Sequence, residues 1–305
     1  MTPTHAQTPR QTLTYIRTLL ETHRLSPKNK MGQNFLIDLN LVDIMVQTAE
    51  LGRDDAILEV GTGTGSLTAR LCDGAGSVVS VELDMDFARM AAELLAGRTN
   101  LSLMHDDILE RKNEMNPGVL KEWNRCAAEA GCKQKKLVAN LPYVVATPVI
   151  ANLLITDLEI ERMVVMVQWE MAERMSAEPN TKDFSALSVL VQSVADVKIV
   201  RRLAPSVFWP MPKVDSAIVL IKPNAEKRKQ ITNVVRFRAF LRDLYTHRRK
   251  NLRQALVGWP TGNKDKKEVD AKLAELGIDG TLRSESMDLL QHRRLFAAFG
   301  DAVPD

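Results

Sequence analysis

The sequence predicts an α/β protein with a Rossmann-like, seven-stranded and mostly parallel sheet, followed by a small all-helical domain. Three observations predict it. Seven short apolar runs recur between residues 56 and 221, and helical patterns separate the first six of them. The loop at 204–216 joins the last two runs without a helical pattern, which indicates an antiparallel pair at one edge of the sheet. No strand pattern remains after residue 223.

The elements follow one another in an order that supports this fold. Residues 8–24 are expected to form a helix because apolar residues recur at helical spacing, and a second helix is expected to begin at Asp38, a residue type favoured as an N-cap. The runs expected to be strands are 56–60, 77–83, 101–105, 137–140, 163–167, 197–203 and 217–221. Residues 108–135 exceed an ordinary connection, and we interpret them as a helical insertion.

The composition changes after residue 223. Residues 222–260 contain eleven Lys and Arg but only two acidic residues, Glu226 and Asp243. We therefore predict a catalytic, cofactor-binding domain at 1–223 and a helical RNA-binding domain at 224–305. A helix at 236–256 would align its arginines in one stripe, which favours phosphate contact over an ordinary solvated face. The residues predicted to bind RNA are Arg238, Arg242, Arg248, Arg249, Lys250 and Arg253.

Composition also limits the class of protein. Of the 305 residues, 45% are hydrophobic and the net charge is only +3, as expected for a globular chain. No apolar stretch approaches the roughly 20 residues that cross a bilayer. The three cysteines form no Cys-x-x-Cys, which predicts neither a disulfide framework nor a metal site. We expect a monomer in the reducing cytoplasm, although a Thr-rich, acid-poor N-terminus leaves an organellar location open.

A glycine-rich loop indicates a cofactor site. The segment 59–65, Glu-Val-Gly-Thr-Gly-Thr-Gly, directly follows the first strand, where Gly61 and Gly63 let the backbone approach a ligand. Glu82 ends the second strand, a position that suits a ribose diol, and Asp107 follows the third, where it suits an adenine amine. The spacing of the glycines differs from the dinucleotide pattern and favours S-adenosylmethionine over NAD(P). The structural alternative is a glycine turn with solvated carboxylates.

A second motif, Asn140-Leu141-Pro142-Tyr143, follows the fourth strand. The Asn140 side-chain carbonyl and the backbone carbonyl of Leu141 are suited to accept the two hydrogens of an adenine amine. Tyr143 is suited to stack on the base, as aromatic rings do for bases turned out of a helix. The alternative is a strand that ends in an ordinary proline turn.

These motifs together resemble the ribosomal RNA adenine N6-dimethyltransferases of the small-subunit (16S-type) branch, over nearly the whole length. The matching segments are 32–36, 59–65, 81–84, 140–143, 179–180 with 187–189, 208–216, 247–253 and 276–278. The resemblance implies a Rossmann-like methyltransferase fold, S-adenosylmethionine as cofactor, and small-subunit rRNA within a pre-ribosomal subunit as partner. It also implies dimethylation of two adjacent adenosines in a hairpin loop near the 3′ end of that RNA.

The resemblance assigns roles to matching positions. Asn34, Leu36 and Gly61 are expected to contact the cofactor, Glu82 its ribose and Asp107 its adenine. Asn140 is expected to bridge cofactor and target amine. The rings of Tyr143 and Phe208 are expected to sandwich the target adenine. Val144 stands where the family usually has Asn, a departure at a position next to the base-stacking Tyr143.

Two other functions stay open from the sequence. One is a large-subunit adenine methyltransferase of the antibiotic-resistance type, which the segment 210–216 disfavours. The other is a non-enzymatic ribosome assembly factor or organellar transcription factor, which the intact Asn140 and glycine loop disfavour.

Overall fold

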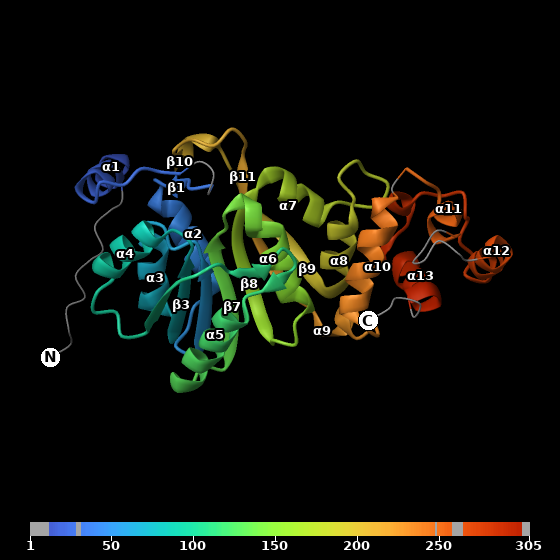
Figure 1. The fold of residues 1–305 in the computed structure, drawn as a ribbon, viewed down its shortest axis with the longest axis horizontal. Helices are drawn as coiled ribbons and strands as arrows, with labels where there is room; N and C mark the ends of the chain where they lie inside the picture. Colours follow the sequence, from blue (N-terminus) through green and yellow to red (C-terminus); the bar gives the residue numbers. More distant parts are fainter. Residues whose placement is uncertain (1–11, 29–31, 248, 258–264, 301–305) are drawn as a thin grey trace. The chain divides into compact units, whose positions relative to one another are not determined.

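The computed structural model describes residues 12–28, 32–247, 249–257 and 265–300 (Figure 1). The chain divides into two compact units. Unit 1 comprises Met1–Trp169 and Ile199–Ile221, and unit 2 comprises Glu170–Lys198 and Lys222–Asp305. Residues 170–198 thus group with the C-terminal part, whereas the sequence placed them in the first domain. The assignment of a catalytic and an RNA-binding domain stays a prediction.

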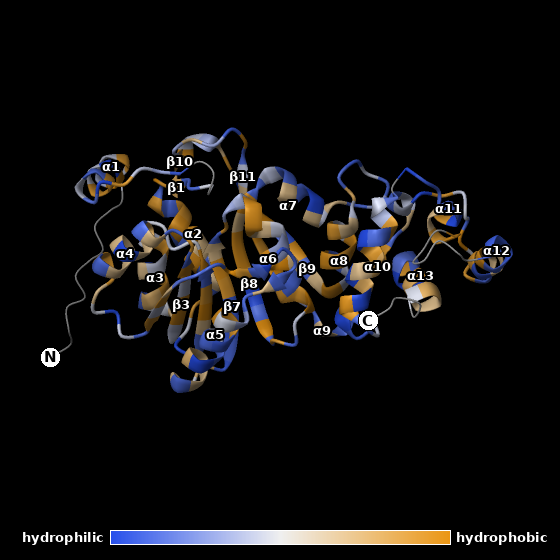
Figure 2. Cartoon of the chain, in the orientation of Figure 1, coloured by the Kyte–Doolittle hydropathy of each residue, from blue (hydrophilic) through white to orange (hydrophobic). Residues whose placement is uncertain are grey.

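The central sheet has seven strands in the order β4-β3-β2-β7-β8-β11-β9. Their bounds are β2 (Asp55–Val60), β3 (Ser77–Glu82), β4 (Leu101–His105), β7 (Gln134–Asn140), β8 (Ile160–Gln168), β9 (Ala195–Leu203) and β11 (Ser216–Pro223). The strands from β4 to β8 run parallel, and β11 pairs antiparallel with β8. All seven predicted strands are confirmed. The inner strands β2, β3, β7, β8 and β11 are largely apolar and buried, as in a sheet that is covered on both faces, whereas the edge strands β4 and β9 are more exposed (Figure 2).

Helices of unit 1 connect the strands. They are α1 (Leu13–Thr22), α2 (Leu39–Ala49), α3 (Ser66–Gly74), α4 (Met85–Leu94), α5 (Pro117–Glu129) and α6 (Tyr143–Ile155), whereas α7 (Trp169–Ser176) belongs to unit 2 from its second residue on. Asp38 caps α2 by accepting the N–H of Asn40, as the sequence predicted. The buried face of α1 carries Ile16, Leu19 and Leu20.

Residues 108–135 differ from the predicted helical insertion. They begin with a two-stranded hairpin, β5 (Leu109–Arg111) and β6 (Glu114–Met115), and continue as α5. The buried face of α5 packs on the sheet, and Trp123 Nε1 donates to the carbonyl of Ala56 at 3.2 Å. Because α5 connects β4 to β7 and covers the sheet, it belongs to the core fold, and only the hairpin is an addition.

A two-stranded sheet joins distant parts of unit 1. β1 (Phe35–Leu36) pairs antiparallel with β10 (Phe208–Trp209), which follows a 3₁₀ turn at Pro205–Val207. The pairing holds the segment before α2 beside the loop before β11. Arg17 of α1 lies over the Trp209 ring, 5.5 Å from its centroid, and adds a contact on the same side.

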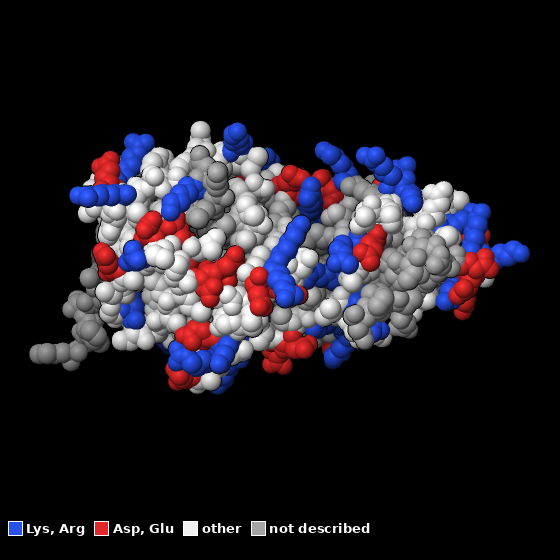
Figure 3. All heavy atoms as spheres, in the orientation of Figure 1, with Lys and Arg blue, Asp and Glu red and all other residues white. Residues whose placement is uncertain are grey.

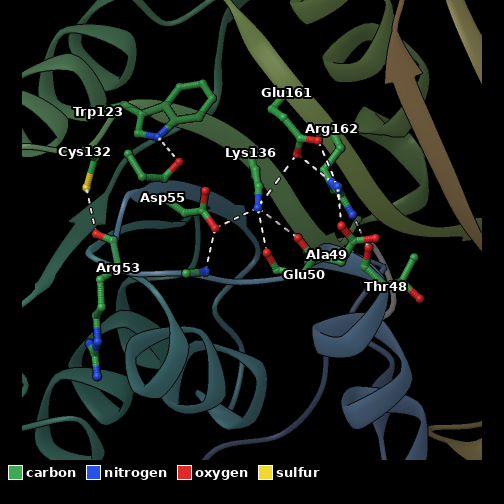
Figure 4. Close-up of polar contacts among 12 residues, drawn as sticks. Thr48, Ala49, Glu50, Arg53, Asp55, Trp123, Cys132, Lys136, Glu161 and Arg162 are labelled. Carbon is green, nitrogen blue, oxygen red and sulfur yellow. Dashed lines mark hydrogen bonds and ion pairs between the residues drawn. The ribbon is translucent and has the colours of Figure 1, made fainter.

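A buried polar network lies at the amino-terminal edge of the sheet (Figure 4). Lys136 of β7 and Asp55 at the start of β2 form an ion pair of 2.7 Å, and each residue is only 2% exposed. The Lys136 ammonium also donates to the carbonyls of Ala49 and Glu50, at the end of α2. Arg162 of β8 extends the network to the Glu50 carboxylate. The network ties α2 to three strands.

Unit 2 is helical. Its other helices are α8 (Ala186–Val194), α9 (Ala225–Arg228), α10 (Val234–Thr246), α11 (Leu252–Val257), α12 (Lys266–Glu275) and α13 (Leu289–Phe299). The rings of Phe237 and Phe240 on α10 both pack on Phe296 of α13, with centroid distances of 5.2 and 5.7 Å.

The predicted single helix at 236–256 is wrong. Helix α10 ends at Thr246 and α11 begins at Leu252. The N–H groups of Leu252 and Arg253 donate to the carbonyls of Leu282 and Gly280. These bonds to a distant loop replace those that would have continued α10, so the arginines do not share one helical stripe.

His292 of α13 is a fully buried histidine in unit 2. Its Nδ1 lies 2.8 Å from the carbonyl of Asp288, which can only accept, so Nδ1 carries the proton. Its Nε2 lies 3.2 Å from the Tyr245 hydroxyl and can accept from it. Burial lowers the pKa of His292 to about 4.

We expect the stability of unit 2 to fall as pH falls from about 6.5 to about 4. In that window the unfolded chain protonates His292 and the folded chain does not, so protons favour unfolding, by about 3 kcal/mol when the window is crossed. Urea unfolding between pH 4 and 7.5 measures this slope. The His292→Gln variant should lose that part of the slope, and an unchanged slope would refute the assignment.

Candidate active site

A cavity of about 320 Å³ lies at the carboxyl ends of β2, β3 and β7, in unit 1. This is the edge at which open α/β sheets bind ligands, and the volume suits a nucleoside-sized molecule. The predicted site residues that line it are Asn34, Leu36, Gly61, Gly63, Glu82, Asp107, Asn140, Leu141, Pro142 and Tyr143. The structure therefore brings together every predicted cofactor residue and the whole Asn140–Tyr143 motif.

The glycine loop needs glycine for both conformation and space. Gly61 and Gly63 have φ of +85° and +54°. A Cβ on Gly61 would lie 3.4 Å from the Pro142 ring, and one on Gly63 would lie 3.4 Å from the Phe35 ring. Larger residues would thus strain the backbone and crowd the cavity.

Glu82 holds the loop in place. Its carboxylate oxygens accept the N–H groups of Gly63 at 2.9 Å and Asp84 at 3.0 Å. Burial raises the pKa of Glu82, and these hydrogen bonds oppose the rise. Each oxygen keeps a further lone pair, so the carboxylate can also accept from a diol in the cavity.

The apolar cavity residues that were not predicted include Leu83 and Ile108. These two residues directly follow Glu82 and Asp107. Apolar side chains beside the two carboxylates suit the faces of a purine, while the carboxylates suit its polar edge and the sugar. The only feature of the sequence that could have identified them is their position, directly after an acidic residue at or just past the end of a strand.

Glu59 is a buried carboxyl group beneath the glycine loop. Its Oε2 accepts from Thr68 and from Ser80, both at 2.6 Å. Burial raises the pKa of Glu59 to about 8, against the effect of these two hydroxyl groups. Glu59 thereby joins β2, β3 and α3 immediately under the site.

The Asn140 side chain has a fixed orientation. Its Nδ2 donates to the carbonyl of Asn34 at 3.3 Å, which leaves Oδ1 available as an acceptor. Leu141 is held by a bond from its N–H to the carbonyl of Met166 at 3.1 Å, one step beyond the β7–β8 pairing. The two acceptors predicted for an amine, the Oδ1 of Asn140 and the C=O of Leu141, thus belong to an anchored segment.

The segment before β1 is tied to the far side of the cavity. Gln33 Nε2 donates to the Asp84 carboxylate at 3.0 Å, and the Lys28 ammonium lies 2.8 Å from the same oxygen. The Lys28 N–H in turn donates to the Gln33 side chain at 2.7 Å. These contacts fix the chain that carries the Asn34 carbonyl, and so the orientation of Asn140.

Phe208 is not at the cavity. Its side chain is 3% exposed, belongs to the core around Leu36 and is absent from the cavity lining. The cause is the β1–β10 pairing, in which Phe208 lies opposite Leu36 and turns inward. The expected pair of rings around the target base is therefore not formed, because only Tyr143 of the two lines the cavity. A stacking role for Phe208 stays a prediction that requires its ring to leave the core.

The predicted RNA-binding residues lie in unit 2 in differing environments. Arg238 on α10 is partly buried, and its pKa is lowered by burial and by the neighbouring Arg242. Arg242 lies 3.1 Å from Asp243, and Arg253 of α11 pairs with Asp270. Arg249 and Lys250 are exposed between α10 and α11, whereas Arg248 lies outside the described residues. On the face drawn in Figure 3, charges of both signs are interspersed, so any phosphate contact depends on local groups.

Among the described residues, no three His, Cys, Asp or Glu side chains are placed to hold a metal ion. The helices that these residues form also include none with the length and apolarity to cross a membrane. All three cysteines are free thiols.

The fold and the cavity define a Rossmann-like, S-adenosylmethionine-dependent methyltransferase. The chain belongs to the ribosomal RNA adenine dimethylase family, whose model matches residues 24–286. A ribosomal RNA small subunit methyltransferase A from Halothermothrix orenii is 36% identical over 275 residues, which cover 90% of this chain and 88% of the relative. The corresponding protein of Pelotomaculum thermopropionicum is 36% identical over 94% of this chain and 96% of its own.

Solved structures give the same result. A dimethyladenosine transferase from Plasmodium falciparum superposes with a TM-score of 0.70 at 25% identity, over 88% of this chain and 98% of that one. The 23S rRNA methyltransferase ErmE has a TM-score of 0.60 at 26% identity, over 87% and 99% of the two chains. The predicted family, fold, enzyme class and cofactor are thereby confirmed.

Proposed function

We propose that this enzyme transfers methyl groups from S-adenosylmethionine to the N6 amines of adenosines in small-subunit rRNA. The observation that carries the proposal is the anchored Asn140–Tyr143 segment, which presents two oxygen acceptors and one aromatic ring to a cavity with the predicted cofactor residues. The relatives named for the small subunit reach 36% identity, whereas ErmE reaches 26%, which favours the small subunit.

The residues of the cavity fit the cofactor. Glu82 and Asp107 would hold its sugar and base beside Leu83 and Ile108, and the glycine loop leaves room for its amino-acid end. When bound, S-adenosylmethionine supplies a methyl group that is already activated by a positively charged sulfur. The protein therefore needs no strong base, and its task is alignment.

Alignment falls to the Asn140–Tyr143 segment. An adenine amine is a weak nucleophile because its lone pair is delocalised into the ring. The Oδ1 of Asn140 and the C=O of Leu141 would each accept one of its hydrogens, which draws the nitrogen towards tetrahedral geometry and directs its lone pair into the cavity. The Tyr143 ring would cover the base and exclude water.

Methylation of isolated subunits tests the proposal. The purified protein and labelled S-adenosylmethionine would be incubated with unmodified small subunits, large subunits and naked rRNA, and the adenosines analysed by mass spectrometry. We expect N6,N6-dimethyladenosine in the small subunit. Label in the large subunit alone would reject the substrate assignment. We further propose that the enzyme acts as a monomer, on a partly assembled subunit, in the cytoplasm. The comparison of naked rRNA with subunits tests which of the two is the substrate.

Arg249 is proposed to contact an RNA phosphate. We expect Arg249→Glu to weaken binding of small-subunit RNA and to lower the slope of log K against log [salt] by about 0.7–0.9 for each phosphate that the side chain no longer neutralises. A filter-binding titration from low to high salt measures both. Lys121→Glu on α5, an equal charge reversal at an exposed position, serves as the control. Parallel salt plots for Arg249→Glu and the unsubstituted protein would exclude a phosphate at this position.

A further inference from the structure

Tyr143 is held by a residue that belongs to none of the expected cofactor or substrate contacts. Its hydroxyl lies 2.8 Å from Oγ of Ser216, the first residue of β11, which is 73 positions away in the sequence. Ser216 is 0% exposed, so its hydroxyl cannot form a hydrogen bond with bulk water in place of the tyrosine. The tyrosine ring lines the cavity while its far end is fastened to the sheet.

Ser216 is itself immobile. It lies opposite Gln168 in the β8–β11 pairing. The preceding residue, Asp215, is held twice: its carbonyl accepts the Trp169 N–H at 2.9 Å, and its carboxylate lies 2.6 Å from the Arg202 guanidinium. That guanidinium stacks on the Trp169 ring, 4.3 Å from the centroid. The Ser216 hydroxyl therefore has a fixed position and can hold the Tyr143 ring in one orientation.

The hydroxyl contact completes a set of three anchors on the substrate-facing segment. The Asn140 side chain is held by the Asn34 carbonyl, the Leu141 N–H by Met166, and the Tyr143 hydroxyl by Ser216. The first two leave the tyrosine able to turn about its side-chain bonds. Only the third fixes where the ring lies, and a ring that must cover an adenine has to be placed to within a fraction of an ångström.

We propose that Ser216 is a positioning residue that sets the Tyr143 ring against the target adenine. The inference rests on the proposed function, and it adds a buried residue of β11 to the methyl-transfer site. Burial raises the pKa of Tyr143, so the phenol stays protonated at neutral pH and its O–H remains available to the serine.

Steady-state kinetics separate positioning from structure. We expect Ser216→Ala to lower kcat for methyl transfer to small subunits by about tenfold, the effect of removing one hydrogen bond that is made in full at the transition state. The KM values for subunit and S-adenosylmethionine should stay within about twofold, because contacts elsewhere provide that binding. Tyr143→Phe should lower kcat as much, and the double variant should lose nothing further.

Ser193→Ala is the matched control, because Ser193 is also 0% exposed and its hydroxyl has no hydrogen-bond partner among the described residues. It should leave kcat unchanged. A Ser216→Ala variant with full kcat would overturn the proposal, as would additive losses in the double variant. If Ser216→Ala does not fold, the kcat of Tyr143→Phe tests the proposal instead. A roughly tenfold loss would support it, and an unchanged kcat would overturn it.

A spectroscopic measurement tests the hydroxyl pair without any activity. With 3-fluorotyrosine in place of the three tyrosines, the ¹⁹F resonance of Tyr143 is identified as the one missing in Tyr143→Phe. We expect Ser216→Ala to shift and narrow that resonance as the ring gains motion, while Ser193→Ala does not. An unmoved resonance would overturn the inference. A moved resonance in a protein that methylates neither subunit would support the hydroxyl pair and reject the proposed function instead.

Discussion

Replacing Asn140 with alanine is expected to lower the rate of methyl transfer by about 10²–10³-fold, the range found when one preorganised polar group is removed from an active site. The variant loses the Oδ1 acceptor, which the contact with the Asn34 carbonyl orients. Affinity for small-subunit RNA should not change, because phosphate contacts supply most of it. Single-turnover methylation and filter binding on the same preparation measure the two quantities.

Two further variants sharpen this test. Asn140→Asp keeps an oxygen at Oδ1 but puts a carboxylate oxygen opposite the Asn34 carbonyl, where Nδ2 now donates at 3.3 Å. Repulsion should turn the side chain away, and the rate should fall almost as far as in the alanine variant. Asn113→Ala, in the exposed β5–β6 turn, should keep the full rate. Methylation by Asn140→Ala within about twofold of the unsubstituted rate would show that another residue orients the amine, since removing one hydrogen bond alone costs more.

The sequence predicted the sheet and the strand-end groups of the cavity because both follow from local patterns. Apolar runs of strand length mark the seven strands of the central sheet, and ligand groups in such sheets come directly after the strands. Glu82, Asp107 and Asn140 could therefore be found by their distance from a strand end. The positive φ of Gly61 and Gly63 was predictable for the same reason, since a tight turn at that point favours glycine.

Four features that the sequence did not predict depend on contacts between distant segments. Phe208 turns inward because β10 pairs with β1, and nothing near Phe208 in the sequence encodes that pairing. The break between α10 and α11 depends on bonds from Leu252 and Arg253 to residues near 281. Nothing in the sequence distinguishes Ser216 from other serines, and its contact with the Tyr143 hydroxyl becomes evident only when β11 is placed in the sheet. That α5 covers the sheet is evident only in the structure, where the Trp123 indole N–H donates to the carbonyl of Ala56, which is distant in the sequence.

Lys136→Met is expected to lower the free energy of unfolding of unit 1 by about 3–5 kcal/mol, the usual cost of removing one partner from a buried ion pair. Methionine fills most of the volume of the lysine stem but leaves Asp55 charged and buried, with the Gly52 N–H as a remaining donor. The carbonyls of Ala49 and Glu50 lose a donor as well. Urea unfolding, followed by tryptophan fluorescence to which the buried Trp123 contributes, measures the change.

An exposed pair nearby provides the control. Lys133 and Asp54 lie 3.0 Å apart, but their side chains are 76% and 62% exposed. Lys133→Met makes the same chemical change and should cost only about 0–1 kcal/mol, because water screens the pair. The Lys136 network lies at the amino ends of the strands and the cavity at their carboxyl ends. Folded Lys136→Met should therefore methylate at nearly the normal rate well below its unfolding midpoint. Equal destabilisation by the two lysine variants would mean that Lys136 packs as an aliphatic stem and that its charge stabilises nothing.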